Sequence, residues 1–305
     1  MQNSRIPSSP LSRASIDALA TPAGNADVDL CFGELRLRLR SLPEDLLGRM
    51  RERYGPYVHE VDPVSDPALT IDAFREERPY FIEPPERSET NPVIIKCVES
   101  CVRFQSYVVA GWFDTESGLG RLAISTGDYD LPERGVENYL RCAVAWVAIT
   151  RGGALVHAAS SVRDGRGYLF YGESGAGKST LSKSNRRGQV VSDDLSLLLD
   201  KPGEGLHLVG TPFRGTYEDG APVLGMFPVA AGFRLIQDTD VKVESVARIV
   251  ALAELVGNLP FVADSFPQRG DLFARVETTF AGVPLRRLHF RPDDSFWDAI
   301  DRVDL

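Results

Sequence analysis

One short stretch of the chain combines the residue types that bind phosphate. The pattern Gly172-x-x-x-x-Gly177-Lys178-Ser179 follows the apolar run "GYLFY" and leads into "KSTLSKSNRR", which predicts a strand, a glycine-rich loop and a short helix. The glycines allow successive backbone N–H groups to turn inward around a phosphate, and the helix start adds its positive dipole end. Lys178 can reach the β- and γ-phosphates, and the Ser179 hydroxyl can ligate Mg²⁺. The predicted nucleotide-phosphate site comprises Gly172, Glu173, Ser174, Gly175, Ala176, Gly177, Lys178, Ser179 and Thr180.

Two adjacent aspartates follow this loop closely. The predicted strand "QVV" runs into Ser192, Asp193 and Asp194, and Asp193 lies 15 positions after Lys178 (193 − 178). Neighbouring residues of an extended strand point to opposite sides, so the two carboxylates can serve two purposes. One can bind or orient Mg²⁺, while the other accepts the proton of an incoming hydroxyl. A turn or helix-cap cluster is the alternative interpretation of the pair.

The same region argues against two other classes of nucleotide-binding protein. Most P-loop NTPases carry the metal-binding aspartate well downstream, whereas here it follows the loop at once. Neither an Asn-Lys-x-Asp guanine motif nor the transporter signature "LSGGQ" appears after the loop. The sequence therefore disfavours a GTPase or a transporter ATPase.

Composition narrows the class further. The 305 residues are 43% hydrophobic and 25% charged, as expected of a globular protein with a real core. The net charge of -9 argues against a nucleic-acid partner. No apolar run is long enough to cross a membrane, and the first residues lack a signal-peptide core. Four cysteines are too few for a disulfide scaffold, so we expect a cytoplasmic protein. Cys97 and Cys101 lack a second pair of Cys or His ligands, so we expect no metal site at these two cysteines.

Apolar periodicity outlines the elements before the loop. Residues 1–27 are rich in Ser, Pro and Ala, which predicts a flexible tail. The run "LCFGELRLRLRSL" predicts a half-buried strand whose arginines face solvent or an acidic partner. An amphipathic helix is predicted for "PEDLLGRMRERYG", and residues 68–126 are strand-like.

The clearest helix pattern is "LPERGVENYLRCAVAWVAITRGG". Val136, Leu140 and Val144 recur at helical spacing, and Gly152 stands just past the end. We place a domain boundary near Arg134. This gives an N-terminal α+β substrate or partner domain over residues 28–134 and a domain with the P-loop over residues 135–305.

Three segments together carry a resemblance to a known family. "GGALVHAASSV", "GYLFYGESGAGKST" and "RRGQVVSDDLSLL" resemble the catalytic half of HPr kinase/phosphorylase, and still more the HPr-kinase-related proteins of bacterial gene clusters. The resemblance covers residues 152–305. It implies an α/β chain (α+β overall) with a P-loop domain of the HPr kinase/phosphoenolpyruvate carboxykinase type and a smaller, strand-rich N-terminal domain.

The resemblance also implies roles for single residues. In that family a histidine on a strand precedes the P-loop, and the second aspartate of the pair accepts the proton of a substrate serine. His157 is then the family histidine, Asp194 the general base, and Lys178 the phosphate contact. Asp193 becomes the supporting carboxylate that shares Mg²⁺ with Ser179. Taken without the resemblance, a lone histidine such as His157 could instead be a hydrogen-bonded structural residue.

Downstream segments extend the resemblance, with one departure. "GTPFRG", "PVLGMFPVAAGFRLI" and "VPLRRLHFRPDDSFWDAID" resemble the related proteins. Arg214 could clamp the γ-phosphate or the acceptor, because guanidinium suits phosphate oxygens, or it could be a surface-loop residue. Pro212 stands where HPr kinases carry a glutamate that ligates Mg²⁺, and nothing in the N-terminal half specifies HPr as a partner.

We therefore expect an ATP- and Mg²⁺-dependent kinase that transfers the γ-phosphoryl group to a hydroxyl. The favoured acceptor is a serine of a protein or peptide other than HPr. The alternatives are a kinase for a small-molecule hydroxyl, and a nucleotide-gated binding or regulatory module without transfer activity. The intact set of Lys178, Ser179, Asp193 and Asp194 favours catalysis. The acceptor, the choice between ATP and GTP, and assembly into a homo-oligomer stay open.

Overall fold

The fold is that of a mixed α/β protein with two sheets of eight strands each. It is given by a computed structural model that describes residues 7–84, 92–127, 132–213, 215 and 221–304. The contacts divide the chain into two compact units, Met1–Val147 and Ala148–Leu305. The sequence places a boundary near Arg134, whereas this division lies within α3 (Pro132–Thr150), the helix with the clearest sequence pattern.

The first unit contains one of the two sheets, helices α1 and α2, and most of α3. Its elements are α1 (Arg13–Asp17), β1 (Ala26–Phe32), β2 (Leu35–Leu42), α2 (Glu44–Tyr54), the 3-10 turn η1 (Gly55–Tyr57), β3 (Val58–His59), β4 (Leu69–Glu76), β5 (Ile94–Val98), β6 (Cys101–Gln105), β7 (Val109–Asp114), β8 (Leu119–Ser125) and α3. The strands follow the order β3-β1-β2-β4-β8-β7-β6-β5. The predicted amphipathic helix is α2, which buries Leu46, Leu47 and Met50.

The single strand predicted over residues 30–42 is a hairpin of β1 and β2. Gly33 has a left-handed φ of 57°, and the chain reverses there so that the two strands pair antiparallel. The leucines of β2 alternate into the core, as the sequence pattern indicates. On the other face, Arg36 and Arg38 bind the fully buried Asp29 at N–O distances of 3.2 and 2.8 Å. An acidic partner for these arginines thus lies in the same unit.

Residues 7–27 are ordered, in contrast to the flexible tail that the sequence predicts. Helix α1 buries Ile16 in a cluster with Trp112 of β7. Farther along, Pro22 forms a bridge with Phe74 of β4. Ile16, this bridge and hydrogen bonds such as those from Trp112 to Asp17 and from Arg121 to the Leu19 carbonyl hold the segment on the sheet. None of these contacts leaves a periodic apolar pattern in the sequence.

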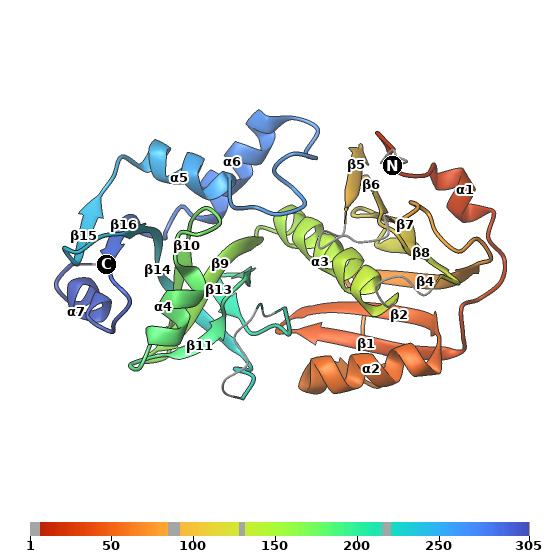
Figure 1. Cartoon of the computed structure of the whole chain (residues 1–305), viewed down its shortest axis with the longest axis horizontal. Coiled ribbons are helices and arrows are strands. Elements are labelled where there is room, and N and C mark those ends of the chain that lie inside the picture. The colour runs from red at the N-terminus through yellow and green to blue at the C-terminus, as the bar shows by residue number, and fades with distance from the viewer. Residues whose placement is uncertain (1–6, 85–91, 128–131, 214, 216–220, 305) are drawn as a thin grey trace. The chain divides into compact units, whose positions relative to one another are not determined.

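The second unit contains the P-loop and the second sheet (Figure 1). Its elements are β9 (Ala154–Arg163), β10 (Arg166–Tyr171), α4 (Lys178–Ser184), β11 (Gln189–Ser192), β12 (Leu195–Lys201), β13 (Gly205–Val209), β14 (Met226–Gln237), β15 (Lys242–Ser245), α5 (Arg248–Val256), α6 (Arg269–Thr279), β16 (Leu285–Phe290) and α7 (Phe296–Asp301). Strands β10, β14 and β16 run parallel, and β9 pairs antiparallel with β10, β11 and β12. Pairings join β9, β10, β14, β13 and β12 into a closed ring. The predicted strands "GYLFY", "QVV" and "LRRLHF" are β10, β11 and β16.

An aromatic core fixes the helix that follows the P-loop. Phe170 of β10 lies against Phe296 and Trp297 of α7, with ring centroids 5.8 and 6.0 Å apart, and Leu181 of α4 joins the same cluster. Helix α4 ends at Ser184, shorter than the run of residues 178–187 that the sequence suggests. The next residue, Asn185, leaves the helix and hydrogen-bonds Ser161 and Trp297.

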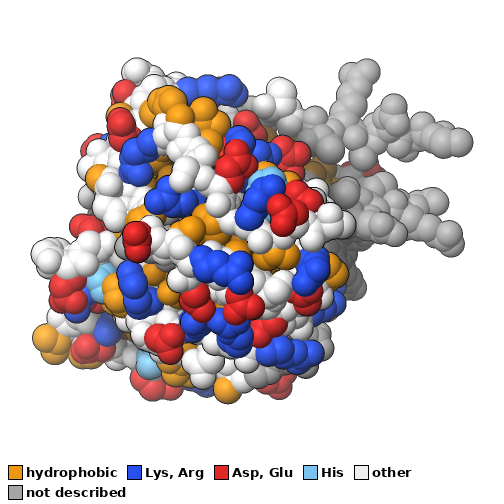
Figure 2. Space-filling model, turned by 90° about the vertical axis from the view of Figure 1, so that its left-hand side faces the viewer, with side chains coloured by type: hydrophobic (Ala, Val, Ile, Leu, Met, Phe, Trp, Pro, Cys, Tyr) orange, Lys and Arg blue, Asp and Glu red, His pale blue; other side chains and the backbone are white. Residues whose placement is uncertain are grey.

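Charges of both signs are mixed on the surface. Figure 2 shows basic and acidic side chains interspersed over one face of the molecule. Arg187 pairs with Asp298 at 2.5 Å and with Asp301 at 2.8 Å, and Arg163 shares Asp301 at 2.9 Å. Neighbouring charges of opposite sign largely cancel at a distance. Within the described part of the chain, no helix combines the length and the apolar character required to span a bilayer.

Candidate functional site

The glycine-rich loop joins the end of β10 to the start of α4. Gly175 and Gly177 have φ of 82° and 102°, the left-handed region that favours glycine. A Cβ built on Gly177 would lie 2.5 Å from the Phe290 ring, so any side chain there would push the loop away from β16. The predicted loop therefore has backbone geometry that only glycine accommodates at these two positions.

Lys178 is held inside this loop. Its amine donates to the carbonyl oxygens of Gly172 and Glu173 at 2.8 and 3.2 Å, and only 7% of the residue is exposed. Burial lowers the pKa of the amine below its ordinary value, and the nearby Asp194 carboxylate opposes that shift. A positive charge with few water contacts is thus available beside the loop.

The paired aspartates connect β11 to β12, and we call this two-residue connection, Asp193 and Asp194, the aspartate step. Ser192, the last residue of β11, pairs with Ser160 of β9, and Leu195, the first residue of β12, pairs with His157 of β9. Asp193 and Asp194 lie between these two pairings and outside both strands. The predicted strand does end just before the pair, but the aspartates form a bend instead of continuing the strand, so the expectation that an extended strand sends their side chains to opposite sides does not apply.

Asp193 is fixed by a neighbouring loop. It is 2% exposed, and its Oδ1 accepts the backbone N–H of Gly215 at 2.7 Å. A Cβ built on Gly215 would lie 3.0 Å from Asp193 Oδ2 and 3.0 Å from Asp194 Cβ. The loop can approach the aspartates this closely because residue 215 is a glycine.

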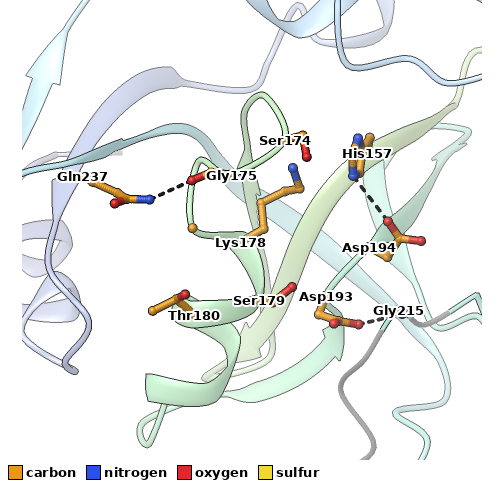
Figure 3. A pocket seen from close by; sticks show the side chains of 11 residues that line it. His157, Ser174, Gly175, Lys178, Ser179, Thr180, Asp193, Asp194, Gly215 and Gln237 are labelled. Atoms are coloured by element: carbon orange, nitrogen blue, oxygen red, sulfur yellow. Dashed lines mark hydrogen bonds and ion pairs between the residues drawn. The ribbon is translucent and has the colours of Figure 1, made fainter. Parts of the chain in front are cut away.

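Asp194 faces a histidine from the adjacent strand. His157 Nε2 lies 3.3 Å from Asp194 Oδ1, and both side chains are about one-third exposed at 38% and 32% (Figure 3). The backbone N–H of His157 donates to the Asn258 carbonyl at 2.8 Å, so the strand itself is anchored and the imidazole is left to face Asp194. A carboxylate with a neighbouring imidazole can take up and share a proton.

These elements line one pocket of about 430 Å³. Figure 3 shows its side chains converging from the loop, β9 and the aspartate step. The lining residues are His157, Ser174, Gly175, Gly177, Lys178, Ser179, Thr180, Asp193, Asp194, Gly215 and Gln237. Of the predicted loop residues, Gly172, Glu173 and Ala176 do not line it. Arg214, a candidate for the γ-phosphate or the acceptor, lies outside the described residues.

The oxygen donors of the pocket suit Mg²⁺. The Ser179 hydroxyl and the Asp193 carboxylate, the two predicted ligands, both line it. Among the described residues, no three His, Cys, Asp or Glu side chains group as metal ligands. Mg²⁺ typically takes one or two carboxylates from the protein and completes its shell with water and substrate phosphates. The Ser179 hydroxyl and the Asp193 carboxylate beside the glycine-rich loop fit this coordination of Mg²⁺.

The sequence did not predict a role in the site for three residues. Gln237, the last residue of β14, donates from Nε2 to the Gly175 carbonyl at 2.7 Å and so holds the tip of the loop. Gly215 binds Asp193, and Ser192 hydrogen-bonds the backbone of the aspartate step. The glycine after Arg214 and the serine before the aspartates were visible as part of motifs. Nothing near Gln237 in the sequence pointed to the loop.

Compared with protein-family models and with curated proteins, the chain matches none. The function must therefore be inferred from the chemistry of the pocket.

Proposed function

We propose that the protein is an ATP- and Mg²⁺-dependent kinase that transfers the γ-phosphoryl group to a hydroxyl, with a serine of a protein or peptide as the favoured acceptor. One observation carries the proposal: a phosphate loop with its lysine and a carboxylate–imidazole pair line the same pocket. Binding of nucleotide alone requires only the loop. A proton acceptor beside it is what transfer to a hydroxyl requires. The resemblance of residues 152–305 to HPr kinase-related proteins agrees with this chemistry.

The loop and its neighbours would hold the nucleotide. Backbone N–H groups of the loop residues that line the pocket and the Lys178 amine would surround the phosphates, and the amine would exchange its two carbonyl partners for phosphate oxygens. Ser179 and Asp193 would hold Mg²⁺, which when bound neutralises charge on the β- and γ-phosphates. The N–H of Gly215 fixes the Asp193 carboxylate by donating to its Oδ1.

Asp194 would act as the general base. As the acceptor oxygen bonds to the γ-phosphorus, the bond to the β,γ-bridging oxygen breaks and its electron pair leaves with ADP. The hydroxyl proton passes to Asp194, and His157 at 3.3 Å can share it. Because little covalent chemistry is needed from the protein, catalysis rests on positioning and on these charges.

The acceptor is inferred to differ from HPr. Pro212 removes an acidic group from the segment next to Gly215, where an HPr kinase would complete its metal site. Misplacement of a reacting group by about 1 Å can cost roughly a hundredfold in rate. Because the segment at Pro212 differs from that of HPr kinases while the phosphate loop and Asp194 are retained, we infer the same phosphoryl transfer to a different hydroxyl.

The test is transfer of radiolabelled γ-phosphate to proteins and peptides encoded beside this gene, with HPr in parallel. The proposal expects labelling of one serine in a neighbour-encoded protein or peptide, abolished by Asp194→Asn, and little labelling of HPr. Rapid stoichiometric labelling of HPr would refute the change of acceptor. Partner binding that depends on ATP but gives no label would favour the nucleotide-gated module, and label on a metabolite would favour the small-molecule kinase.

A further inference from the structure

The buried Ser192 hydroxyl makes three hydrogen bonds. Ser192 is 1% exposed, and its hydroxyl donates to the Phe213 carbonyl at 3.2 Å. The same oxygen accepts the backbone N–H groups of Asp194 at 3.2 Å and Leu195 at 3.1 Å. A hydroxyl has one donor and two acceptor positions, so all three are used.

The hydrogen bonds to the Ser192 hydroxyl stabilise the backbone where the chain lies outside β11 and β12. The chain leaves β9 after the pair Ser192–Ser160 and returns at the pair Leu195–His157. In between, the N–H of Asp194 bonds to the Ser192 side chain instead of to a neighbouring strand. Serine side chains stabilise tight turns in this way. The direction of the Asp194 carboxylate toward His157 therefore depends on this turn.

The same hydroxyl ties a second segment to the turn. Phe213 is fully buried and bonds to Ser192 through its carbonyl, while Gly215 bonds to the Asp193 carboxylate through its N–H at 2.7 Å. The aspartate step and the segment beside it are thus joined at two points, one at Ser192 and one at Asp193. A change at Ser192 is expected to loosen both.

We propose that Ser192 is a positioning residue that orients the general base Asp194 and, through the loop at Gly215, the Mg²⁺-binding Asp193. This inference rests on the proposed kinase function. Ser192 does not line the pocket, so it acts through the aspartates and not on the substrate. The Lys178 amine bonds to the carbonyls of Gly172 and Glu173 and not to Ser192, so the loop is expected to bind nucleotide without Ser192.

Three variants separate positioning from general packing. Ser192→Ala removes the hydroxyl, and Ser192→Thr keeps it. Ser196→Ala is the matched control: Ser196 lies on β12, is also 1% exposed, and its hydroxyl contacts the Ala158 carbonyl and the Ser160 hydroxyl, both at 2.8 Å. It touches neither aspartate in those bonds.

The measurements are steady-state ATP hydrolysis with water as acceptor, and calorimetric affinity for a non-hydrolysable ATP analogue. For Ser192→Ala at saturating Mg²⁺ we expect kcat to fall at least about tenfold while KM for ATP and the analogue affinity stay within about twofold. Ser192→Thr should recover most of kcat, and Ser196→Ala should retain it. An unchanged kcat in Ser192→Ala, or equal losses in Ser192→Ala and Ser196→Ala, would overturn the inference.

A second readout keeps the inference separate from the kinase proposal. If the wild type turns over no ATP with any acceptor, the proposed function fails. The positioning is then judged by a Mg²⁺ titration of analogue binding, in which Ser192→Ala should raise the Mg²⁺ concentration for half-maximal effect at least about fivefold. The same midpoint in Ser192→Ala and in wild type would overturn it.

Discussion

Replacing Lys178 with methionine isolates the contribution of its charge to nucleotide binding. The amine now rests on the carbonyls of Gly172 and Glu173, and both contacts would be exchanged for contacts with phosphate oxygens. A hydrogen bond to a charged group contributes about 1.5–3 kcal/mol, and about 1.4 kcal/mol is tenfold in affinity. Affinity for a non-hydrolysable ATP analogue should therefore fall between about tenfold and about a hundredfold.

The same variant carries a pH signature. Because burial lowers the pKa of the Lys178 amine, the folded protein binds this proton less tightly than the unfolded chain, whose amine has the ordinary value of 10.5. The charged amine therefore costs folding free energy, and the cost disappears as pH rises from the lowered pKa toward 10.5. The unfolding free energy of the wild type minus that of Lys178→Met should rise with pH across this alkaline range. Urea unfolding without nucleotide measures it.

Calorimetric titration of both proteins, with Mg²⁺ present, measures the binding loss. Lys183→Met is the matched control, because Lys183 lies exposed in the last turn of the same helix and does not line the pocket. The control should bind the analogue as the wild type does. Unchanged affinity in a well-folded Lys178→Met would refute the phosphate site. A stability difference that falls with rising pH would refute the account of the buried charge.

Four further predictions concern other parts of the chain. Asp194→Asn should abolish transfer with analogue affinity nearly unchanged, whereas Asp193→Asn should raise the Mg²⁺ requirement; identical behaviour in both assays would contradict the division of roles. Gln237→Leu should weaken analogue binding severalfold, on the order of one hydrogen bond, by freeing the Gly175 carbonyl, as calorimetry would show. Asp29→Asn should lower the unfolding free energy by about 1–3 kcal/mol, because it leaves the half-buried Arg36 and Arg38 without their charged hydrogen-bond acceptor. Burial raises the pKa of Asp29, but hydrogen bonds from Arg38 and Arg36 outweigh it and hold this pKa below 3.8. The stability that the carboxylate contributes should therefore be present above pH 3.8 and be lost as pH falls through the lowered pKa. Acid unfolding of the wild type and of Asp29→Asn measures this loss.

Features that depend on neighbouring residues could be predicted from the sequence. The P-loop follows from glycines at set spacing between an apolar run and a helical one, and the structure has β10, the loop and α4 in that order. Helices α2 and α3 follow from apolar residues at helical spacing. Strand β11 ends at the aspartate pair, as predicted. Backbone conformation and amphipathic burial depend on a few adjacent positions, which is why these elements could be read locally.

Features that join distant residues were decided by the tertiary structure. His157 meets Asp194 because β12 pairs with β9 in the register Leu195–His157, and a shift of one residue would turn each side chain to the other face. Gln237 reaches Gly175 because β14 runs parallel to β10 and extends beyond it. Neither contact leaves a trace in local spacing.

The same distinction explains the expectations that the structure changed. The sequence showed apolar alternation in residues 30–42, but the turn at Gly33 and the carboxylate that binds the arginines, Asp29, became evident only once β1 and β2 were paired. The N-terminal residues pack through Ile16 on a sheet whose strands come later in the chain. The sequence by itself determined which residues form the glycine-rich loop and where the aspartates stand along the chain. Only the tertiary structure decided which side chains face them, because strand register and the approach of Gly215 depend on packing between segments far apart in sequence.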